Sequence, residues 1–244
     1  MTPPLFLIDV LPTGDFVVLG GAEGRHARRV KRVTVGERVL VGDGRGTVLT
    51  CQVTAAATDD QLCLQLLDRR AEPVPDPRLV VVQALPKSDR AELAVEALTE
   101  LGADEIIPWA AQRSVGQWRD GRGAKALAKW RRTAREATKQ SRRSWLPYVA
   151  ELASTSDVTV RIGASASALV LHEAADEPLA AAPLPASGDL VVVVGPEGGL
   201  SPDELDTFRA TGGQPVRLGT PVLRTATAGA AALAAVSVRL GRWN

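Results

Sequence analysis

Two patterns of apolar and polar positions divide the chain. Residues 1 to about 70 contain short strand-like stretches separated by turns such as Val41-Gly42-Asp43-Gly44, which is typical of a small β-barrel. One helical segment, from about Ala22 to Arg32, interrupts them. The predicted strands are Leu5–Asp9, Phe16–Leu19, Arg38–Val41, Thr47–Val53 and Leu62–Leu67.

Three prolines in Glu72-Pro73-Val74-Pro75-Asp76-Pro77 predict a stiff, extended linker over residues 72–78. Beyond it, strand and helix patterns alternate, which predicts a parallel sheet with helices on both faces over residues 79–244. The expected strands are Leu79–Ala84, Glu105–Trp109, Ala168–Leu171 and Leu190–Val194, and the expected helices are Asp89–Leu101, Lys125–Arg143 and Thr225–Leu240.

Two details refine this pattern. In the first of these helices, one apolar face is predicted to be buried; it carries Leu93, Ala94, Ala97, Leu98 and Leu101. The Ala/Pro-rich stretch Ala174–Gly188 is predicted to contain a surface loop.

The most informative segment follows the all-apolar run Leu190–Val194, which is typical of a strand buried on both faces. Glycines and a proline in Gly195–Gly199 end that strand. Ser201-Pro202-Asp203-Glu204 then starts a helix with a cap, a proline at the first position and early acids. A strand, a glycine turn and a helix form a common ligand site in α/β proteins. The spacing matches neither the P-loop nor the dinucleotide fingerprint.

Charge is unevenly distributed on a chain whose formal net charge is only +1. Arg25, Arg28, Arg29, Lys31 and Arg32 cluster with no acid between them. A second basic run extends from Arg119 to Arg143 and is interrupted by only two acids, Asp120 and Glu136. Two basic patches on a nearly neutral chain indicate a locally bound polyanion; solvated helix faces are the alternative.

A second segment, Leu218-Gly219-Thr220-Pro221-Val222-Leu223-Arg224-Thr225-Ala226-Thr227-Ala228, follows about twenty residues after the glycine turn. Together the two segments resemble the C-terminal signature of the SPOUT methyltransferases. The similarity is greatest to the RsmE type, which methylates uridine N3 in small-subunit (16S) ribosomal RNA. This chain has Ala226 where that family often has Glu.

The resemblance implies an α/β fold with two domains. A PUA-like, RNA-binding small β-barrel is expected over residues 1–71, and a SPOUT methyltransferase domain over residues 79–244. In the family, a deep trefoil knot, here at about residues 168–230, holds S-adenosylmethionine and forms a homodimer interface. Local patterning alone does not predict a knot, because knots are rare among folds.

The resemblance also implies three walls for the cofactor site, at the ends of two strands and in the Leu218–Ala228 segment. Glycines there allow close approach of the backbone to a ligand. His172 has an alternative reading as an ordinary residue at a strand end, and Gly198 and Gly199 as a plain turn. The expected cofactor-binding residues are Leu171, His172, Gly195, Pro196, Gly198, Gly199, Leu218, Gly219, Val222, Leu223, Thr225 and Ala228.

Two side chains are candidates for the chemistry. Methylation at uracil N3 requires loss of its proton, and negative charge then develops on O2 and O4. Arg224 is the candidate cation for that charge, and an ion pair or a helix-start contact is its alternative role. Glu197 is the candidate proton acceptor, or a group that orients one; alternatively, it accepts backbone N–H bonds.

The RNA-binding candidates combine the basic patches with family-like segments. Gln140 is expected to bond a flipped uracil, and Arg142 and Arg143 to bind flanking phosphates. The full expected set is Arg25, His26, Arg28, Arg29, Arg32, Arg113, Lys139, Gln140, Arg142 and Arg143.

Other classes of site and location are not indicated. Cys51 and Cys63 sit in strand-like stretches and are expected to be reduced thiols of a cytoplasmic protein. Two histidines and two cysteines without metal spacing predict no metal site. No apolar stretch reaches about 18 residues, so no membrane span is expected, and the first residues do not resemble a signal peptide.

Two competing functions stay open. One is a SPOUT enzyme that acts on transfer RNA or on a ribose 2′-hydroxyl. The other is an RNA-binding ribosome-assembly factor that no longer catalyses methyl transfer. The exact nucleotide, and whether the substrate is free ribosomal RNA or an assembled particle, are also left undecided.

Overall fold

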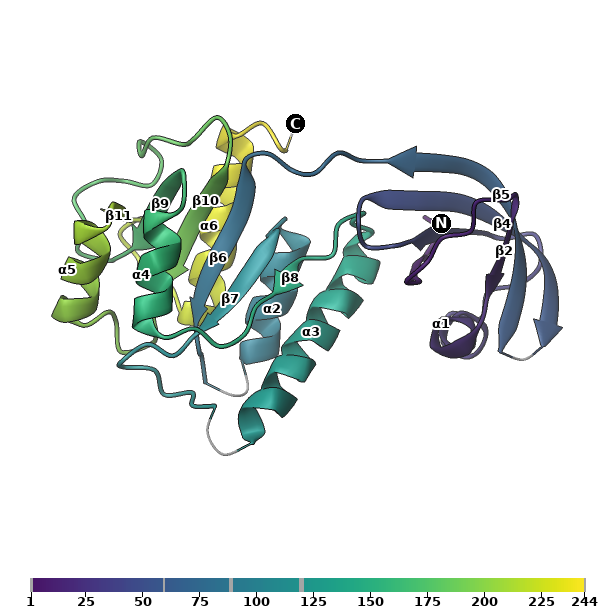
Figure 1. Cartoon of the computed structure of the whole chain (residues 1–244), viewed down its shortest axis with the longest axis horizontal. Coiled ribbons are helices and arrows are strands. Elements are labelled where there is room, and N and C mark those ends of the chain that lie inside the picture. The colour runs from purple at the N-terminus through teal and green to yellow at the C-terminus, as the bar shows by residue number, and fades with distance from the viewer. Residues whose placement is uncertain (1, 59, 88–89, 119–120, 244) are drawn as a thin grey trace. The chain divides into compact units, whose positions relative to one another are not determined.

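The structure is a computed structural model that describes residues 2–58, 60–87, 90–118 and 121–243 (Figure 1). The chain divides into two compact units. Unit 1 consists of Met1–Val74 with Thr138–Leu146, and unit 2 consists of Pro75–Ala137 with Pro147–Asn244. Thr138–Leu146 falls within the range expected for the second domain, residues 79–244, but the structure groups this segment with unit 1.

Unit 1 is built on a five-stranded sheet in the order β1-β3-β4-β5-β2. Its inward-facing side chains, such as Phe6, Leu49 and Leu64, are fully buried. All five predicted strands are present; the first is shorter than predicted, and the last two along the chain are longer. The strands are β1 (Leu5–Leu7), β2 (Phe16–Leu19), β3 (Arg38–Gly42), β4 (Thr47–Thr58) and β5 (Gln61–Ala71).

The predicted helical segment of unit 1 is present in two parts. Helix α1 (Gly21–Arg25) continues directly into a π-helical turn, η1 (His26–Val30). Ala27 packs into the core of the unit, while Arg29 and Val30 are exposed. Single π-turns are rare and occur often at functional sites.

Unit 2 contains six parallel strands in the order β11-β9-β10-β6-β7-β8. Strands β6 and β10 pair at the centre, where the order of connection reverses, and such a reversal marks the ligand-binding edge of an open α/β sheet. The strands are β6 (Arg78–Ala84), β7 (Glu105–Trp109), β8 (Tyr148–Val149), β9 (Ser167–Leu171), β10 (Asp189–Val194) and β11 (Gly213–Val216).

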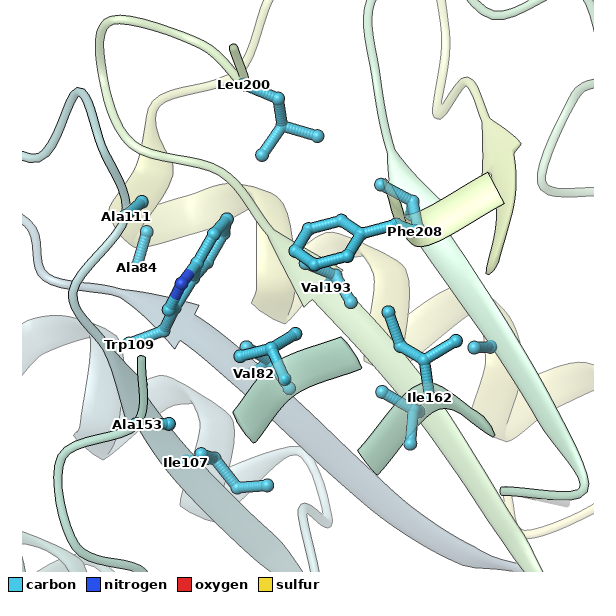
Figure 2. Close-up of a cluster of buried hydrophobic side chains, with 14 of the residues drawn as sticks. Val82, Ala84, Ile107, Trp109, Ala111, Ala153, Ile162, Val193, Leu200 and Phe208 are labelled. Atoms are coloured by element: carbon cyan, nitrogen blue, oxygen red, sulfur yellow. The ribbon is translucent and has the colours of Figure 1, made fainter. Parts of the chain in front are cut away.

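Helices cover both faces of this sheet. Helices α4 and α5 pack on one face, and α2 and α6 pack together on the other (Figure 1). The first face carries Trp109 and Phe208, whose rings meet edge to face with centroids 5.4 Å apart (Figure 2). The helices are α2 (Ala91–Glu100), α3 (Arg122–Ser141), α4 (Thr155–Gly163), α5 (Pro202–Ala210) and α6 (Thr225–Arg239).

The buried face of α2 differs from the expected one. Asp89 lies outside the described residues, and in α2 Leu93 is 52% exposed while Val95 is buried, so the buried face is rotated from the predicted one.

The 174–188 stretch is irregular and mostly exposed, as predicted. The side chains of Leu179 and Ala182 are nevertheless buried, and Arg239 donates to their carbonyls at 2.8 and 2.6 Å. Three elements, α4, β8 and β11, were not predicted from the local pattern.

A network of four charges joins the amino ends of three central strands. Arg161 of α4 contacts Asp189 at 2.6 Å and Glu105 at 3.1 Å, and Arg78 contacts the same two carboxylates at 3.4 and 3.2 Å. Burial acts to lower the pKa of Arg161, but hydrogen bonds and attraction from Asp189 and Glu105 raise the pKa above its ordinary value. The network therefore fixes α4 to the edge of the sheet opposite the strands' carboxyl ends.

Replacing Arg161 by Met should lower the free energy of unfolding by about 2 kcal/mol, because two partly buried carboxylates would share only Arg78. Urea denaturation measures this change. Arg209→Met is the matched control, since Arg209 pairs with Asp206 on an exposed helix surface. It should change stability by no more than about 0.5 kcal/mol. Equal losses in both variants would show that the network adds nothing specific.

Candidate functional site

A cleft of about 320 Å³ opens at the carboxyl ends of β9, β10 and β11. This volume falls within the range of small-molecule sites, roughly 300–1,000 Å³. Three segments far apart in the sequence form its walls. The lining residues are Leu171, His172, Glu173, Val194, Gly195, Pro196, Glu197, Gly199, Leu200, Arg217, Leu218, Gly219, Pro221, Val222, Leu223, Arg224, Thr225 and Ala228.

The first wall is the end of β9. The backbone N–H of His172 continues the sheet by donating to the carbonyl of Val216 at 3.0 Å. The imidazole Nδ1 accepts the N–H of Ala174 at 3.2 Å. A neutral ring with Nδ1 as acceptor carries its proton on Nε2, so His172 offers a hydrogen-bond donor there.

The second wall is the turn that follows β10. The N–H of Gly199 closes the turn on the carbonyl of Pro196 at 2.9 Å. Gly199 has φ +70°, a left-handed conformation that favours glycine, and the space beside its Cα is open. Helix α5 then begins with the predicted cap, in which Ser201 and Glu204 exchange hydrogen bonds.

Gly198 differs from the other predicted cofactor residues in its surroundings. It does not line the cleft, and a Cβ at this position would lie 3.1 Å from the Cβ of Arg113. The guanidinium of Arg113 donates through Nη1 to the carbonyls of Gly198 and Leu200, both at 3.3 Å. Gly198 therefore provides room for the Arg113 loop. Arg113, an expected RNA contact, has one nitrogen engaged by the turn.

The third wall joins β11 to α6. Two apolar side chains of this wall are unusually open, with Val222 80% and Leu223 41% exposed. Exposed apolar side chains that line a cleft are suited to cover part of an apolar ligand. Ala226, at the position where the family often has Glu, is buried in the first turn of α6 and does not line the cleft.

Arg224 is the N-cap residue of α6, and its carbonyl accepts the N–H groups of Thr227 and Ala228 at 2.8 and 2.9 Å. Its side chain is exposed and lines the cleft. Within the described part of the chain, the guanidinium has no hydrogen-bond or ion-pair partner. Of its alternative roles, the helix-start contact is therefore observed, but only through the backbone carbonyl. The side chain forms no ion pair with the described residues, so the guanidinium is available to a ligand.

Glu197 also lines the cleft, but one of its oxygens is engaged. Its Oε1 accepts the backbone N–H of Lys87 at 3.2 Å. The alternative role, acceptance of a backbone N–H, is therefore observed. A carboxylate held in this way can still present its second oxygen to the cleft.

Most of the predicted cofactor residues come together in the cleft; of that set, only Gly198 lies outside it. Three lining residues, Val194, Leu200 and Arg217, lie outside the three predicted walls. Arg217 follows β11, a short strand interrupted by Pro215 that gives little strand signal. Leu200 stands between the turn and the helix cap, where an apolar residue has no periodic partner.

In unit 1, the arginine cluster lines a hollow of about 340 Å³, formed by Arg28, Arg29, Arg32 and Thr34. Arg29 and Arg25 pair with Asp60 at 3.0 and 3.8 Å, so part of the positive charge is compensated. Arg32 is exposed and adopts φ +55°.

His26 is half-buried, with its ring edge-on to Phe6 at a centroid distance of 6.1 Å. Its position therefore matches packing within unit 1 better than a direct contact with RNA.

The segment at the end of α3 also differs from expectation. Lys139 is buried and paired with Glu23 at 3.1 Å, so this residue stabilises unit 1 rather than offering a free charge. Arg142 donates through Nε to the carbonyl of Pro3 at 2.9 Å. Gln140 is exposed, and Arg143 is half-buried.

Two further properties bear on function. Among the residues that the structure describes, no cluster of three or more histidine, cysteine or acidic side chains is arranged to hold a metal ion. In the same residues, no helix has both the length and the apolar character needed to span a membrane.

Comparison with known proteins gives a consistent result. The model of an RNA methyltransferase domain family matches residues 73–237, and that of an RNA methyltransferase PUA domain matches residues 19–67. A ribosomal RNA small subunit methyltransferase E of Mycobacterium bovis is 44% identical over 249 residues, covering 100% of this chain and 95% of the relative. The ribosomal RNA small subunit methyltransferase E of Bacillus subtilis is 30% identical, and the match covers 89% of this chain and 88% of the relative.

A solved structure agrees with these relatives. The crystal structure of a ribosomal RNA small subunit methyltransferase E from Neisseria gonorrhoeae bound to S-adenosyl methionine is 27% identical. The match covers 98% of each chain with a TM-score of 0.87. The cleft, the parallel sheet and the two matched domains thus point the same way: the chain belongs to the ribosomal RNA small subunit methyltransferase E family of RNA methyltransferases.

Proposed function

We propose that this RNA methyltransferase transfers a methyl group from S-adenosylmethionine to N3 of a uridine in small-subunit (16S) ribosomal RNA. The observation that carries the proposal is the cleft at the carboxyl ends of β9 to β11. It holds Arg224, whose side chain has no partner among the described residues, beside an exposed apolar wall. Membership of the family and the cofactor-bound neighbour support the choice of cofactor.

The residues of the cleft fit this cofactor. Leu171, Leu218 and Leu223 offer apolar surface for an adenine, and the glycine turn brings backbone groups close. Glu173 and Glu197 place negative charge where a sulfonium and an ammonium group need it. When bound, S-adenosylmethionine supplies an electrophilic methyl group.

Two side chains of the cleft would act on the substrate in different ways. Arg224 would face the negative charge that develops on O2 or O4 of the uracil. Because no other described residue pairs with its guanidinium, Arg224 is available for that charge. Glu197 accepts or orients the N3 proton through the oxygen that Lys87 does not engage. The cleft walls align the reacting groups, which is itself a large source of rate.

We also propose how the chain divides into domains, where it binds RNA and where it dimerises. We place the domain boundary at residues 72–78, with RNA held by unit 1 through the hollow of Arg28, Arg29 and Arg32. Leu93 of α2 and Val238 of α6 are exposed apolar residues on two adjacent helices, which supports a homodimer interface on that side of unit 2. The free thiols of Cys51 and Cys63 agree with a cytoplasmic enzyme.

We further propose a trefoil knot at about residues 168–230. The 172–188 connection between β9 and β10 contacts the C-terminal segment at two separate points. Leu179 donates to the carbonyl of Arg217 at 2.8 Å, and Arg239 of α6 donates to carbonyls of the same connection. These contacts, on either side of the third wall, support a chain that passes through this connection.

Mass spectrometry of nucleosides tests the function directly. Purified protein with S-adenosylmethionine should convert one uridine in small-subunit ribosomal RNA, or in the assembled particle, to 3-methyluridine. Transfer to a 2′-hydroxyl, or only to transfer RNA, would replace the proposed target by another. Cofactor binding without transfer to any RNA would instead favour a non-catalytic assembly factor.

Arg224→Ala should slow single-turnover methyl transfer by on the order of a hundredfold, roughly 3 kcal/mol, with little change in cofactor affinity. The charge that Arg224 stabilises is fully developed only in the transition state. Arg224→Lys should retain part of the rate, and Arg209→Ala, which removes an exposed charge of α5, serves as the control.

The pH dependence separates Arg224 from Glu197. Raising the pH should partly restore Glu197→Ala, because more uracil N3 is then already deprotonated, whereas Arg224→Ala should gain no such advantage over the parent. Identical pH profiles for all three proteins would contradict this division of roles and leave alignment as the source of the rate.

RNA affinity should depend on salt through the arginine hollow of unit 1. Replacing Arg28, Arg29 and Arg32 together by Gln should reduce the slope of log affinity against log salt by roughly 2, since each phosphate contact contributes somewhat less than one unit. Filter binding at several salt concentrations measures the slope, with Arg209→Gln as the control. An unchanged slope would remove this hollow from the RNA-binding surface.

A further inference from the structure

Behind the turn that forms the second wall lies a buried carboxylate, that of Glu204, only 4% exposed. Its Oε2 accepts the backbone N–H of Ser201 at 3.0 Å. Its Oε1 accepts the backbone N–H of Gln112 at 2.8 Å and the hydroxyl of Thr155 at 3.3 Å. In the described part of the chain, this carboxylate forms no ion pair, so hydrogen bonds alone compensate its burial.

Capping of α5 needs only the first of these contacts. The N-terminus of α4 shows this, because Ser154 and Asp157 form the same reciprocal cap. The Asp157 carboxylate is exposed, and among the described residues its hydrogen bonds are confined to the cap. Glu204 is one methylene longer than Asp157, and its second oxygen reaches a different segment. It thereby connects the start of α5 to the loop after β7 and to Thr155.

That loop returns to the turn through its next residue. Arg113 donates from Nη1 to the carbonyls of Gly198 and Leu200, and its Cβ packs against Gly198. Glu204 therefore fixes the loop at Gln112, and the next residue of that loop, Arg113, fixes the 195–200 turn. On the opposite side of the turn, Gly195, Pro196 and Gly199 face the cleft.

We propose that Glu204 and Arg113 are positioning residues of the cofactor site, which fix the 195–200 turn in the shape that S-adenosylmethionine requires without touching it. This inference rests on the proposed function, since it takes the cleft as the place of the cofactor. It assigns Arg113 a role that needs no RNA.

The two hydrogen-bonded oxygens explain why a carboxylate stands at position 204. Both oxygens accept a backbone N–H, and an amide has only one oxygen. Glu204→Gln would place its NH₂ group opposite one of the two backbone N–H donors, that of Ser201 or that of Gln112. Both that N–H and the NH₂ group would then be buried without an acceptor. The turn or the loop must then shift, although the side chain keeps its size.

The first test is S-adenosylmethionine titrated into the full chain without RNA, at a temperature where every variant is folded by circular dichroism. Glu204→Gln should weaken affinity by about tenfold, the equivalent of one unsatisfied buried donor. Asp157→Asn is the matched control: it weakens the equivalent cap of α4 and should leave affinity within about twofold of the parent. At saturating cofactor, methyl transfer by Glu204→Gln should return close to the parent rate.

The second test uses Arg113→Met, which keeps the contact with Gly198 but removes both hydrogen bonds. Because Arg113 is exposed, this variant should melt close to the parent temperature and still bind cofactor several-fold more weakly; Arg113→Lys should recover part of the affinity. This variant decides the matter if Glu204→Gln does not fold. Parent-like affinity in both folded variants would overturn the positioning role, whereas failure of the parent itself to bind would overturn the proposed function.

Discussion

The burial of β10 on both faces is the constraint on which the sheet and the cleft both depend. Val191 and Val193 pack under α4 and α5, while Val192 and Val194 face the side of α2 and α6. Such burial is possible only if both neighbouring strands are present, and β10 pairs with β6 and β9 in parallel along nearly its whole length. The strand ends at Val194, its last buried valine, and the glycine turn begins at the next residue, Gly195.

The shape of that turn is determined from several sides. The left-handed Gly199 lets the chain reverse next to the cleft, and the capping box of Ser201 and Glu204 starts α5 immediately afterwards. Backbone carbonyls that the turn leaves unused are taken by Arg113. A turn held at each of these points is pre-organised, and pre-organisation reduces the entropy lost when a ligand binds.

The sequence predicted the layers and most of the strands because their signals are local. Leu190–Val194 and Glu105–Trp109 are apolar runs of strand length, and Ser201 to Glu204 carry their own cap. The short strand β11 carries a proline, which weakens its strand signal. Helix α4 begins with the Ser154–Asp157 cap, but its β-branched residues favour strands, so its local signals conflict. The rotation of α2 that exposes Leu93 depends on packing against α6, which no local pattern contains.

The candidate site was predictable in its residues but not in their roles. Gly198 and Gly199 are adjacent in one motif, yet the first makes room for Arg113 and the second adopts the left-handed conformation. Family resemblance identifies such a motif as a whole. Only the contacts of each position separate a residue that faces the ligand from one that supports it.

The basic side chains show the same distinction in terms of charge. Lys139 is buried and forms an ion pair with Glu23, so its charge stabilises unit 1. Arg29 is exposed but shares its charge with Asp60. Arg224 has neither a partner nor cover in the described chain, and it stands in a cleft between apolar residues. An exposed cation at this position fits the role proposed for Arg224, which is to face negative charge that arrives with a ligand or develops during the reaction.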